Sequence, residues 1–319
     1  MKKHLILSIL LGAFMQGFSQ NAITEDAITL KTPTGDIYGT LLIPNLGNPV
    51  PVVLIIAGSG PTDRNGNQPA MKNNSLKMLA EGLCSNGIAS LRFDKRGIAQ
   101  SKAAVRSESE LSFETYIQDV RSWVDLLKKD SRFSSINIVG HSEGSLIGMI
   151  AAEGNPNVAK YVSVAGIGVP MDQTLKEQLG RQLVAHSELK DTCFSYIDRL
   201  KRGEKFGNVD PNLLALFRPS VQPYLISAFK YNPQEEIKKL TIPILILQGN
   251  ADIQVNVADA DLLAAANANA KKLIIENMNH VLKNCSGKDL TEQMPTYTDP
   301  DIPIREKLVE GIAAFVKGK

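Results

Sequence analysis

Short apolar runs rich in β-branched residues recur along this chain, with helical patterns between most of them. The clearest runs are residues 52–56, 88–93, 136–139, 161–165, 242–247 and 273–275. A continuous apolar run is typical of a strand that is covered on both faces, as in a parallel sheet. Because strand–helix alternation favours right-handed crossovers, the sequence predicts an α/β fold around a mostly parallel central sheet.

The N-terminal part of the mature chain follows another pattern. Residues 27–31 and 36–43 flank Pro33-Thr34-Gly35 and partly alternate between apolar and polar side chains. This arrangement predicts an antiparallel hairpin at one edge of the sheet. Residues 113–127 place apolar side chains at helical spacing after Ser112, a good N-cap, and residues 305–316 predict the last helix.

Between about residues 168 and 233 the alternation stops, and no strand-like run occurs. Instead, apolar residues recur at helical spacing, at Met171, Leu175, Leu179 and Leu183 and then at Phe194, Ile197 and Leu200. Long insertions in compact domains often act as lids, so we expect a helical lid over the C-terminal edge of the sheet. The alternative is a second packing layer with no role at the site.

Residues 1–19 have the pattern of a secretory signal peptide. Lys2 and Lys3 precede an apolar stretch at residues 5–14 that is too short to cross a bilayer, and Gly17-Phe18-Ser19 suits cleavage after Ser19. A buried N-terminal helix is the alternative. We therefore expect residues 20–319 to form a single exported domain with the helical insertion, in a periplasm or outside the cell.

Charge gives no reason to expect nucleic-acid or membrane partners. The chain carries a net charge of +2, and without Lys2 and Lys3 its 35 basic residues fall to 33, against 33 acidic ones. A neutral chain without a basic run has no electrostatic attraction for nucleic acid or anionic lipid. No later segment is apolar and long enough for membrane insertion, and the sequence leaves the oligomeric state open.

Three cysteines are present, so they cannot all pair within one chain. Cys84 lies on a helical pattern and is expected in the core. Cys193 and Cys285 are candidates for a disulfide in an oxidising compartment, although spacing alone does not establish one. No Cys/His spacing resembles a zinc site, so no metal is expected.

A G-x-S-x-G motif, Gly140-His141-Ser142-Glu143-Gly144, follows one apolar run and precedes a helical pattern. In this context a sharp strand-to-helix turn presents the serine hydroxyl above the sheet, where it can act as a nucleophile. An inert serine in a tight turn is the alternative. Ser142 is therefore the candidate nucleophile.

A serine needs an adjacent base, and the chain contains four histidines. His4 lies in the signal segment, His186 lies in the insertion, and the side chain of His141 is expected to point away from the reaction face of Ser142. His280 remains, just after the last strand-like run, and a structural histidine in a loop is its alternative.

The acid should lie between serine and histidine, in the order typical of this fold class. Asp252 follows the 242–247 run and is the candidate that would orient His280. A turn-forming aspartate is the alternative. Asp259 and Asp261 are rivals, but they lie in an alanine-rich helical stretch where solvated acids are ordinary.

An oxyanion hole needs two backbone N–H donors near the serine. We expect one from Glu143 and one from Ser59, in the loop after the first parallel strand, with Gly60 as the alternative for the second donor. No glycine-rich nucleotide fingerprint occurs, so no cofactor is expected.

These stretches resemble the α/β-hydrolase superfamily and, more narrowly, bacterial esterases of the dienelactone-hydrolase and serine-aminopeptidase-like group. The resemblance extends from about residue 27 to the C-terminus, apart from the insertion, and is carried by residues 58–67, 92–98, 140–144, 249–252 and 279–280. It implies a Ser142–Asp252–His280 triad. The chain departs from the pattern at Ala57, where many relatives have histidine, and at Ala99, where they often have glycine.

The sequence therefore predicts a serine hydrolase that cleaves small-molecule carboxylic esters through an acyl-enzyme on Ser142. A serine peptidase or amidase of the same superfamily stays open as an alternative. A non-catalytic binding protein on a hydrolase scaffold is the third possibility, because a fold alone does not guarantee activity.

Overall fold

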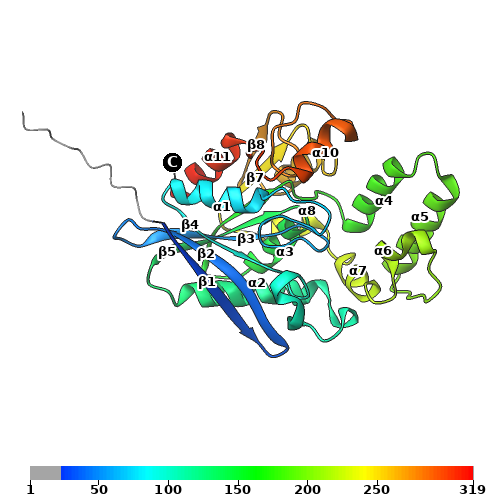
Figure 1. Ribbon diagram of the computed structural model, residues 1–319, viewed down its shortest axis with the longest axis horizontal. Coiled ribbons are helices and arrows are strands. Elements are labelled where there is room, and N and C mark those ends of the chain that lie inside the picture. The colour runs from blue at the N-terminus through cyan, green and yellow to red at the C-terminus, as the bar shows by residue number, and fades with distance from the viewer. Residues whose placement is uncertain (1–22, 319) are drawn as a thin grey trace, which may run out of the picture.

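The computed structural model describes residues 23–318 (Figure 1). The predicted signal peptide at residues 1–19 lies outside the described residues. Within residues 23–318, no helix combines the length and the hydropathy that crossing a membrane requires.

An eight-stranded sheet forms the centre of the molecule, in the order β1-β2-β4-β3-β5-β6-β7-β8. β1 and β2 form an antiparallel hairpin, β2 is antiparallel to β4, and the remaining neighbours are parallel. This confirms the mostly parallel sheet with an antiparallel hairpin at its N-terminal edge. The strands are β1 (Ile23–Thr32), β2 (Gly35–Pro44), β3 (Val50–Ile56), β4 (Ala89–Phe93), β5 (Phe133–His141), β6 (Val158–Val164), β7 (Ile244–Gly249) and β8 (Ala270–Ile275).

Helices cover both faces of the sheet, as Figure 1 shows. One face packs against α1 (Ser75–Ser85) and α11 (Glu306–Lys317), and the other against α2 (Phe113–Lys128), α3 (Glu143–Ala152) and α9 (Val257–Ala266). α2 begins at the predicted N-cap, because the Ser112 hydroxyl accepts the Thr115 N–H and the Thr115 hydroxyl accepts the Ser112 N–H.

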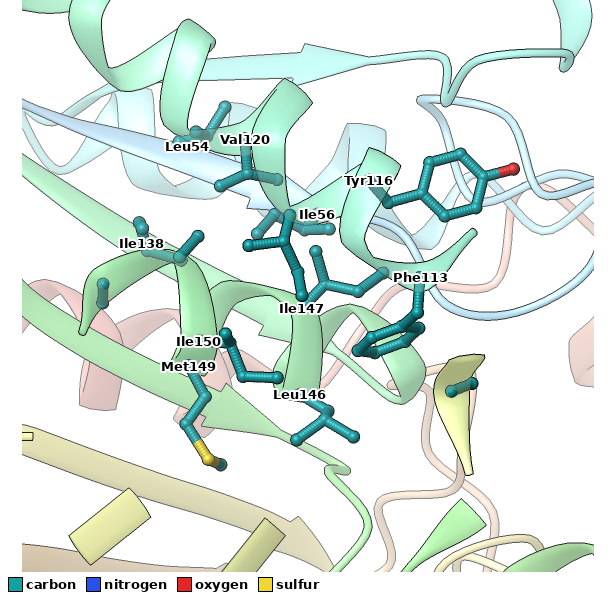
Figure 2. Close-up of a cluster of buried hydrophobic side chains, with 14 of the residues drawn as sticks. Leu54, Ile56, Phe113, Tyr116, Val120, Ile138, Leu146, Ile147, Met149 and Ile150 are labelled. Atoms are coloured by element: carbon teal, nitrogen blue, oxygen red, sulfur yellow. The ribbon is translucent and has the colours of Figure 1, made fainter. Parts of the chain in front are cut away.

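The strand in the middle of the sheet explains why the apolar runs are continuous. Val52, Leu54 and Ile56 of β3 join the core on the α2–α3 face, and Val53 and Ile55 join the core on the α1–α11 face. All five side chains are almost completely buried. Figure 2 shows the first of these cores, with side chains of α2 and α3 over β3 and β5. Alternate side chains of a strand point to opposite faces, so both faces need apolar residues here.

The segment between β6 and β7 is helical throughout its regular structure and contains α4 (Met171–Gln182), α5 (Ser187–Lys201), α6 (Leu214–Phe217), α7 (Gln222–Ala228) and α8 (Pro233–Lys238). We refer to residues 168–233 as the helical insertion. In Figure 1, α4 to α7 extend beyond the carboxyl ends of the parallel strands. Four buried side chains of the insertion extend the core on the α2–α3 face of the sheet: Cys193, Ile197, Leu200 and Phe217.

All three cysteines are free and buried. The Cys193 side chain lies in the core on the α2–α3 face, whereas the Cys285 thiol contacts the Gly287 and Glu292 carbonyl oxygens. The Cys193–Cys285 disulfide that the sequence left open is therefore not formed.

Candidate active site

Ser142 lies in a strained turn between β5 and α3. Its backbone has φ 53° and ψ −124°, a conformation that residues with a side chain rarely adopt and that is typical of functional sites. The Ser142 N–H donates to the Val164 carbonyl at 2.9 Å, which helps to hold the turn.

The two glycines of the motif allow backbone segments to approach closely around Ser142. A Cβ at Gly140 would lie 2.2 Å from the Gly144 carbonyl oxygen, and a Cβ at Gly144 would lie 2.4 Å from the Ile56 carbonyl oxygen. Neither position has space for a side chain, because the neighbouring atoms belong to the backbone. The spacing of the motif therefore follows from the packing of the turn.

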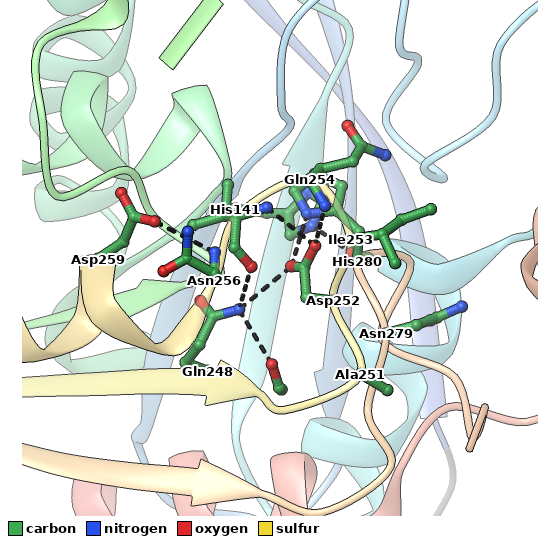
Figure 3. Close-up of polar contacts among 12 residues, drawn as sticks. His141, Gln248, Ala251, Asp252, Ile253, Gln254, Asn256, Asp259, Asn279 and His280 are labelled. Atoms are coloured by element: carbon green, nitrogen blue, oxygen red, sulfur yellow. Dashed lines mark hydrogen bonds and ion pairs between the residues drawn. The ribbon is translucent and has the colours of Figure 1, made fainter. Parts of the chain in front are cut away.

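The structure brings Asp252 and His280 together, 28 positions apart in the sequence. His280 Nδ1 lies 2.8 Å from Asp252 Oδ2, and both side chains are buried (Figure 3). The Asp252 Oδ1 accepts the N–H groups of Gln254 and Val255, and the Gln248 amide donates to Oδ2 at 3.2 Å. An ionised carboxylate only accepts hydrogen bonds, so the proton of His280 is on Nδ1 and its Nε2 is left to act as a base.

His141 does not point away from the reaction face, and that expectation is wrong. Its Nε2 lies 2.8 Å from the His280 carbonyl oxygen, and the two rings lie 4.9 Å apart between centroids. Burial, together with the nearby His280, lowers the pKa of His141 to about 3. His141 is therefore neutral near pH 7 and donates through Nε2 to the backbone that carries the base.

Ser142 and His280 line the same small cavity. Within the described part of the chain, the Ser142 hydroxyl forms no side-chain hydrogen bond, and it faces the cavity that His280 also lines. Catalytic hydrogen bonds are often long in structures without substrate and shorten in the complex. The arrangement has the order and the neighbours that serine-based acyl transfer needs.

The loop after β3 and the start of α3 meet beside Ser142. Glu143 is the first residue of α3, so its N–H has no partner within the helix. Ser59 lines both cavities at the serine, whereas Gly60 lines only the larger one. Ser59, Gly60 and Glu143 thus all line the larger cavity together with Ser142.

Lys95 connects these two segments, although it was not among the site residues predicted from the sequence. Its Nζ donates to the Gly58 carbonyl at 2.5 Å and lies 3.5 Å from Glu143 Oε1, and the side chain is buried. Burial lowers the pKa of Lys95, and the Glu143 carboxylate opposes that shift. Lys95 therefore holds the residue before Ser59 and the side chain of Glu143 in one network.

Removing this network should slow the chemical step. Replacing Lys95 with methionine alone would leave the Glu143 carboxylate buried and unpaired, which would destabilise the fold. The test therefore combines Lys95→Met with Glu143→Gln, which removes both charges. The double variant should lower kcat for an activated ester about 10-fold or more with little change in KM, because the oxyanion donors lose their positions.

The matched control for this prediction is Lys160→Met. Lys160 also donates to backbone carbonyls, those of Phe315 and Val316, but it lines neither cavity. It should lower the melting temperature without lowering kcat. A double variant with normal kcat and reduced thermal stability would give Lys95 a purely structural role.

Two cavities meet at Ser142. The larger has a volume of about 710 Å³ and lies between the sheet and the helical insertion, with mostly apolar walls. The smaller has a volume of about 240 Å³ and contains His280 in its wall. Ser59, Gln68 and Ser142 line both of them. Both cavities are therefore open to a molecule that reaches Ser142.

Every charged side chain that lines the larger cavity has a partner of opposite charge. Besides the Lys95–Glu143 pair, Arg96 Nε lies 3.0 Å from Asp119, and Arg218 Nε lies 2.8 Å from Glu108. The cavity therefore presents no uncompensated charge to a ligand.

The rival acids lie elsewhere. Asp259 is buried, contrary to the expectation of a solvated acid, because its carboxylate accepts the N–H groups of Gly168 and Asn256 and fixes the start of α9. Asp261 is exposed and pairs with Lys272, and His186 precedes α5 on the surface. Within residues 23–318, no cluster of three His, Cys, Asp or Glu side chains is arranged to hold a metal ion.

Residues 71–284 match the serine aminopeptidase family S33, which is about two thirds of the chain. The chain belongs to this family. The family match covers Ser142, Asp252 and His280, while the Ser59 loop precedes it.

Among curated proteins, esterase EstD of Thermotoga maritima is similar to this chain, with 28% identity over 257 residues. The alignment covers 78% of this chain and 59% of that protein, so the chain spans about three fifths of its relative's length.

Solved structures confirm the α/β-hydrolase fold. Est1E from Butyrivibrio proteoclasticus is similar with a TM-score of 0.58 at 18% identity, over 92% of this chain and 99% of its own. An esterase of Pyrococcus furiosus gives 0.60 at 15% identity, over 93% and 91% of the two chains. Dienelactone hydrolase from Anabaena variabilis gives 0.51 at 17% identity, over 86% and 95%. At these identities the likeness concerns the fold.

Proposed function

We propose that this chain is a serine carboxylesterase. One observation carries the proposal: Ser142 lines both cavities, and it shares the smaller one with His280. Asp252 orients the imidazole of His280. The relative from T. maritima is itself an esterase, which supports the same reaction. Ser142 attacks the ester carbonyl as His280 Nε2 takes its proton, and N–H groups of Glu143 and of Ser59 or Gly60 stabilise the oxyanion.

The position of His280 decides which half of the ester enters which cavity. When the tetrahedral intermediate collapses, His280 must give its proton to the leaving alkoxide. The alcohol therefore occupies the small cavity, which His280 lines, and the acyl group occupies the large cavity beside Glu143. In the second half-reaction, water takes the place of the alcohol and releases the acid.

Charge pairing favours an esterase over an aminopeptidase. An aminopeptidase must hold the α-ammonium group of its substrate, which needs a carboxylate that is free to pair with it. The carboxylates in the wall of the large cavity, Glu108 and Glu143, already pair with Arg218 and Lys95. A neutral acyl group suits this cavity, because a buried ammonium without a partner is costly.

A matched pair of substrates tests this proposal. We expect the p-nitrophenyl ester of octanoic acid to give a kcat/KM at least about 10-fold above that of the 2-aminooctanoic ester, after each is divided by its rate with hydroxide. Intact-protein mass spectrometry should detect an octanoyl adduct on the rapidly quenched enzyme. A preference for the amino ester, together with cleavage of aminoacyl anilides, would instead support the peptidase alternative.

A further inference from the structure

The small cavity beside His280 is lined largely by neutral polar side chains. Its side chains include six neutral polar groups, which we call the polar recess: Thr62, Gln68, Asn73, Ser75, Gln254 and Tyr297. Among residues 23–318, no Asp, Glu, Lys or Arg lines this cavity, and Met71 and Val281 are its larger apolar residues. A ligand that suits these walls is neutral and offers several hydrogen-bonding groups.

The hydrogen bonds within the polar recess show which of its polar atoms can still bind a ligand. Thr62 donates its only hydroxyl hydrogen to the Ser59 carbonyl at 2.8 Å, so it accepts from Gln68 Nε2 at 2.9 Å. This fixes the orientation of the Gln68 amide and leaves its Oε1 without a hydrogen bond among the described residues. Gln68 is half-buried, and its amide oxygen only accepts, so a ligand hydroxyl can donate to it in place of water.

A second group of atoms that can bind a ligand belongs to Gln254 and Tyr297, close to Asp252. The Gln254 amide donates to the Tyr297 hydroxyl at 2.9 Å, which leaves Gln254 Oε1 as an acceptor and the phenol hydrogen as a donor. Burial raises the pKa of Tyr297, which keeps the phenol protonated. The Gln254 backbone N–H also donates to Asp252, so this side of the recess is fixed to the catalytic acid.

We propose that the polar recess binds the alcohol half of the ester and that this alcohol is a neutral polyol, such as glycerol or a sugar. The inference rests on the proposed esterase function. A polyol supplies both the donors that Gln68 and Gln254 need and an acceptor for Tyr297, whereas a simple alkyl alcohol would cover these groups without pairing them. Gln68 and Gln254 are half-buried, so a bound alcohol displaces water from them, and an alcohol without further hydroxyls would leave them unpaired. A site discriminates against such an analogue in this way.

The test compares two esters with the same acyl group, 1-monooctanoylglycerol and propyl octanoate, by titration of the released acid. We expect the glycerol ester to have a kcat/KM about 10-fold higher or more. The variants Gln254→Leu and Tyr297→Phe should each reduce this ratio several-fold. The matched controls Gln118→Leu and Tyr231→Phe change the same residue types outside both cavities and should keep the ratio of the wild type.

Equal kcat/KM values for the two esters would overturn the polyol proposal, as would a preference that neither recess variant reduces. In both cases p-nitrophenyl octanoate would still be hydrolysed, so the proposed esterase function would stand. Failure to hydrolyse any of the three esters would instead contradict the proposed function itself.

Discussion

Replacing Ser142 with alanine is expected to lower kcat for ester hydrolysis by about 10⁵–10⁶-fold, the effect typical of removing the nucleophile of a serine triad. Without the hydroxyl no acyl-enzyme forms, and only binding and the oxyanion donors still favour the transition state. The measurement is turnover of p-nitrophenyl octanoate by purified enzyme, together with labelling by a fluorophosphonate. The labelling should be lost.

His280→Ala should lose activity to a similar extent, and the double variant should be little worse than either single one, because the two residues act as a unit. Ser85→Ala, a change on the exposed end of α1, is the matched control and should behave as the wild type does. Full labelling of the Ser142→Ala protein would assign the nucleophile to another residue.

The strands and helices were predictable because local sequence carries their periodicity. The continuous apolar run at Val52–Ile56 reflects a strand buried on both faces, and Ser112 precedes α2 as an N-cap. The chain order of Ser142, Asp252 and His280 likewise led to side chains that the structure brings to one site. The signal peptide at residues 1–19, the exported location and the lid role of the insertion stay predictions.

What local sequence could not show were contacts between distant segments. His141 bonds the carbonyl of His280, 139 positions away, and no periodicity indicates such a pair. Lys95 lies in residues 92–98, to which the sequence assigned no role at the site, yet its side chain reaches both Gly58 and Glu143. The only sequence signal for Lys95 was a lysine two residues after the buried strand β4, where a charge is retained only if it finds a partner.

Asp259 is a residue for which local sequence predicted exposure, whereas tertiary packing buries it. Its helical, alanine-rich context suggested a solvated acid, but the carboxylate accepts the N–H of Gly168, at the start of the insertion, at 2.8 Å. Propensity identified the helix correctly, whereas burial of its first turn depends on tertiary packing.

Replacing Asp252 with asparagine should lower kcat by about 10⁴-fold while changing KM little, as expected when a triad acid is made neutral. The side-chain amide introduced by Asp252→Asn would donate to His280 Nδ1, so the imidazole proton would move to Nε2, and that nitrogen could no longer take a proton from Ser142. The fold should be retained, because the amide oxygen can still accept the N–H groups of Gln254 and Val255. Steady-state turnover of p-nitrophenyl octanoate gives kcat and KM, and the melting temperature measured alongside reports on the fold.

Asp259→Asn is the matched control, since it makes the same change at another buried aspartate that accepts two backbone N–H groups. This variant does not alter the tautomer of His280, so kcat should stay within a few-fold of the wild type even if stability falls. Comparable losses of kcat in the two variants would mean that general loosening of this region, and not the tautomer of His280, explains the effect. A loss below about 10-fold in Asp252→Asn would show that the Asp252–His280 contact at 2.8 Å orients the ring without being needed to set its proton.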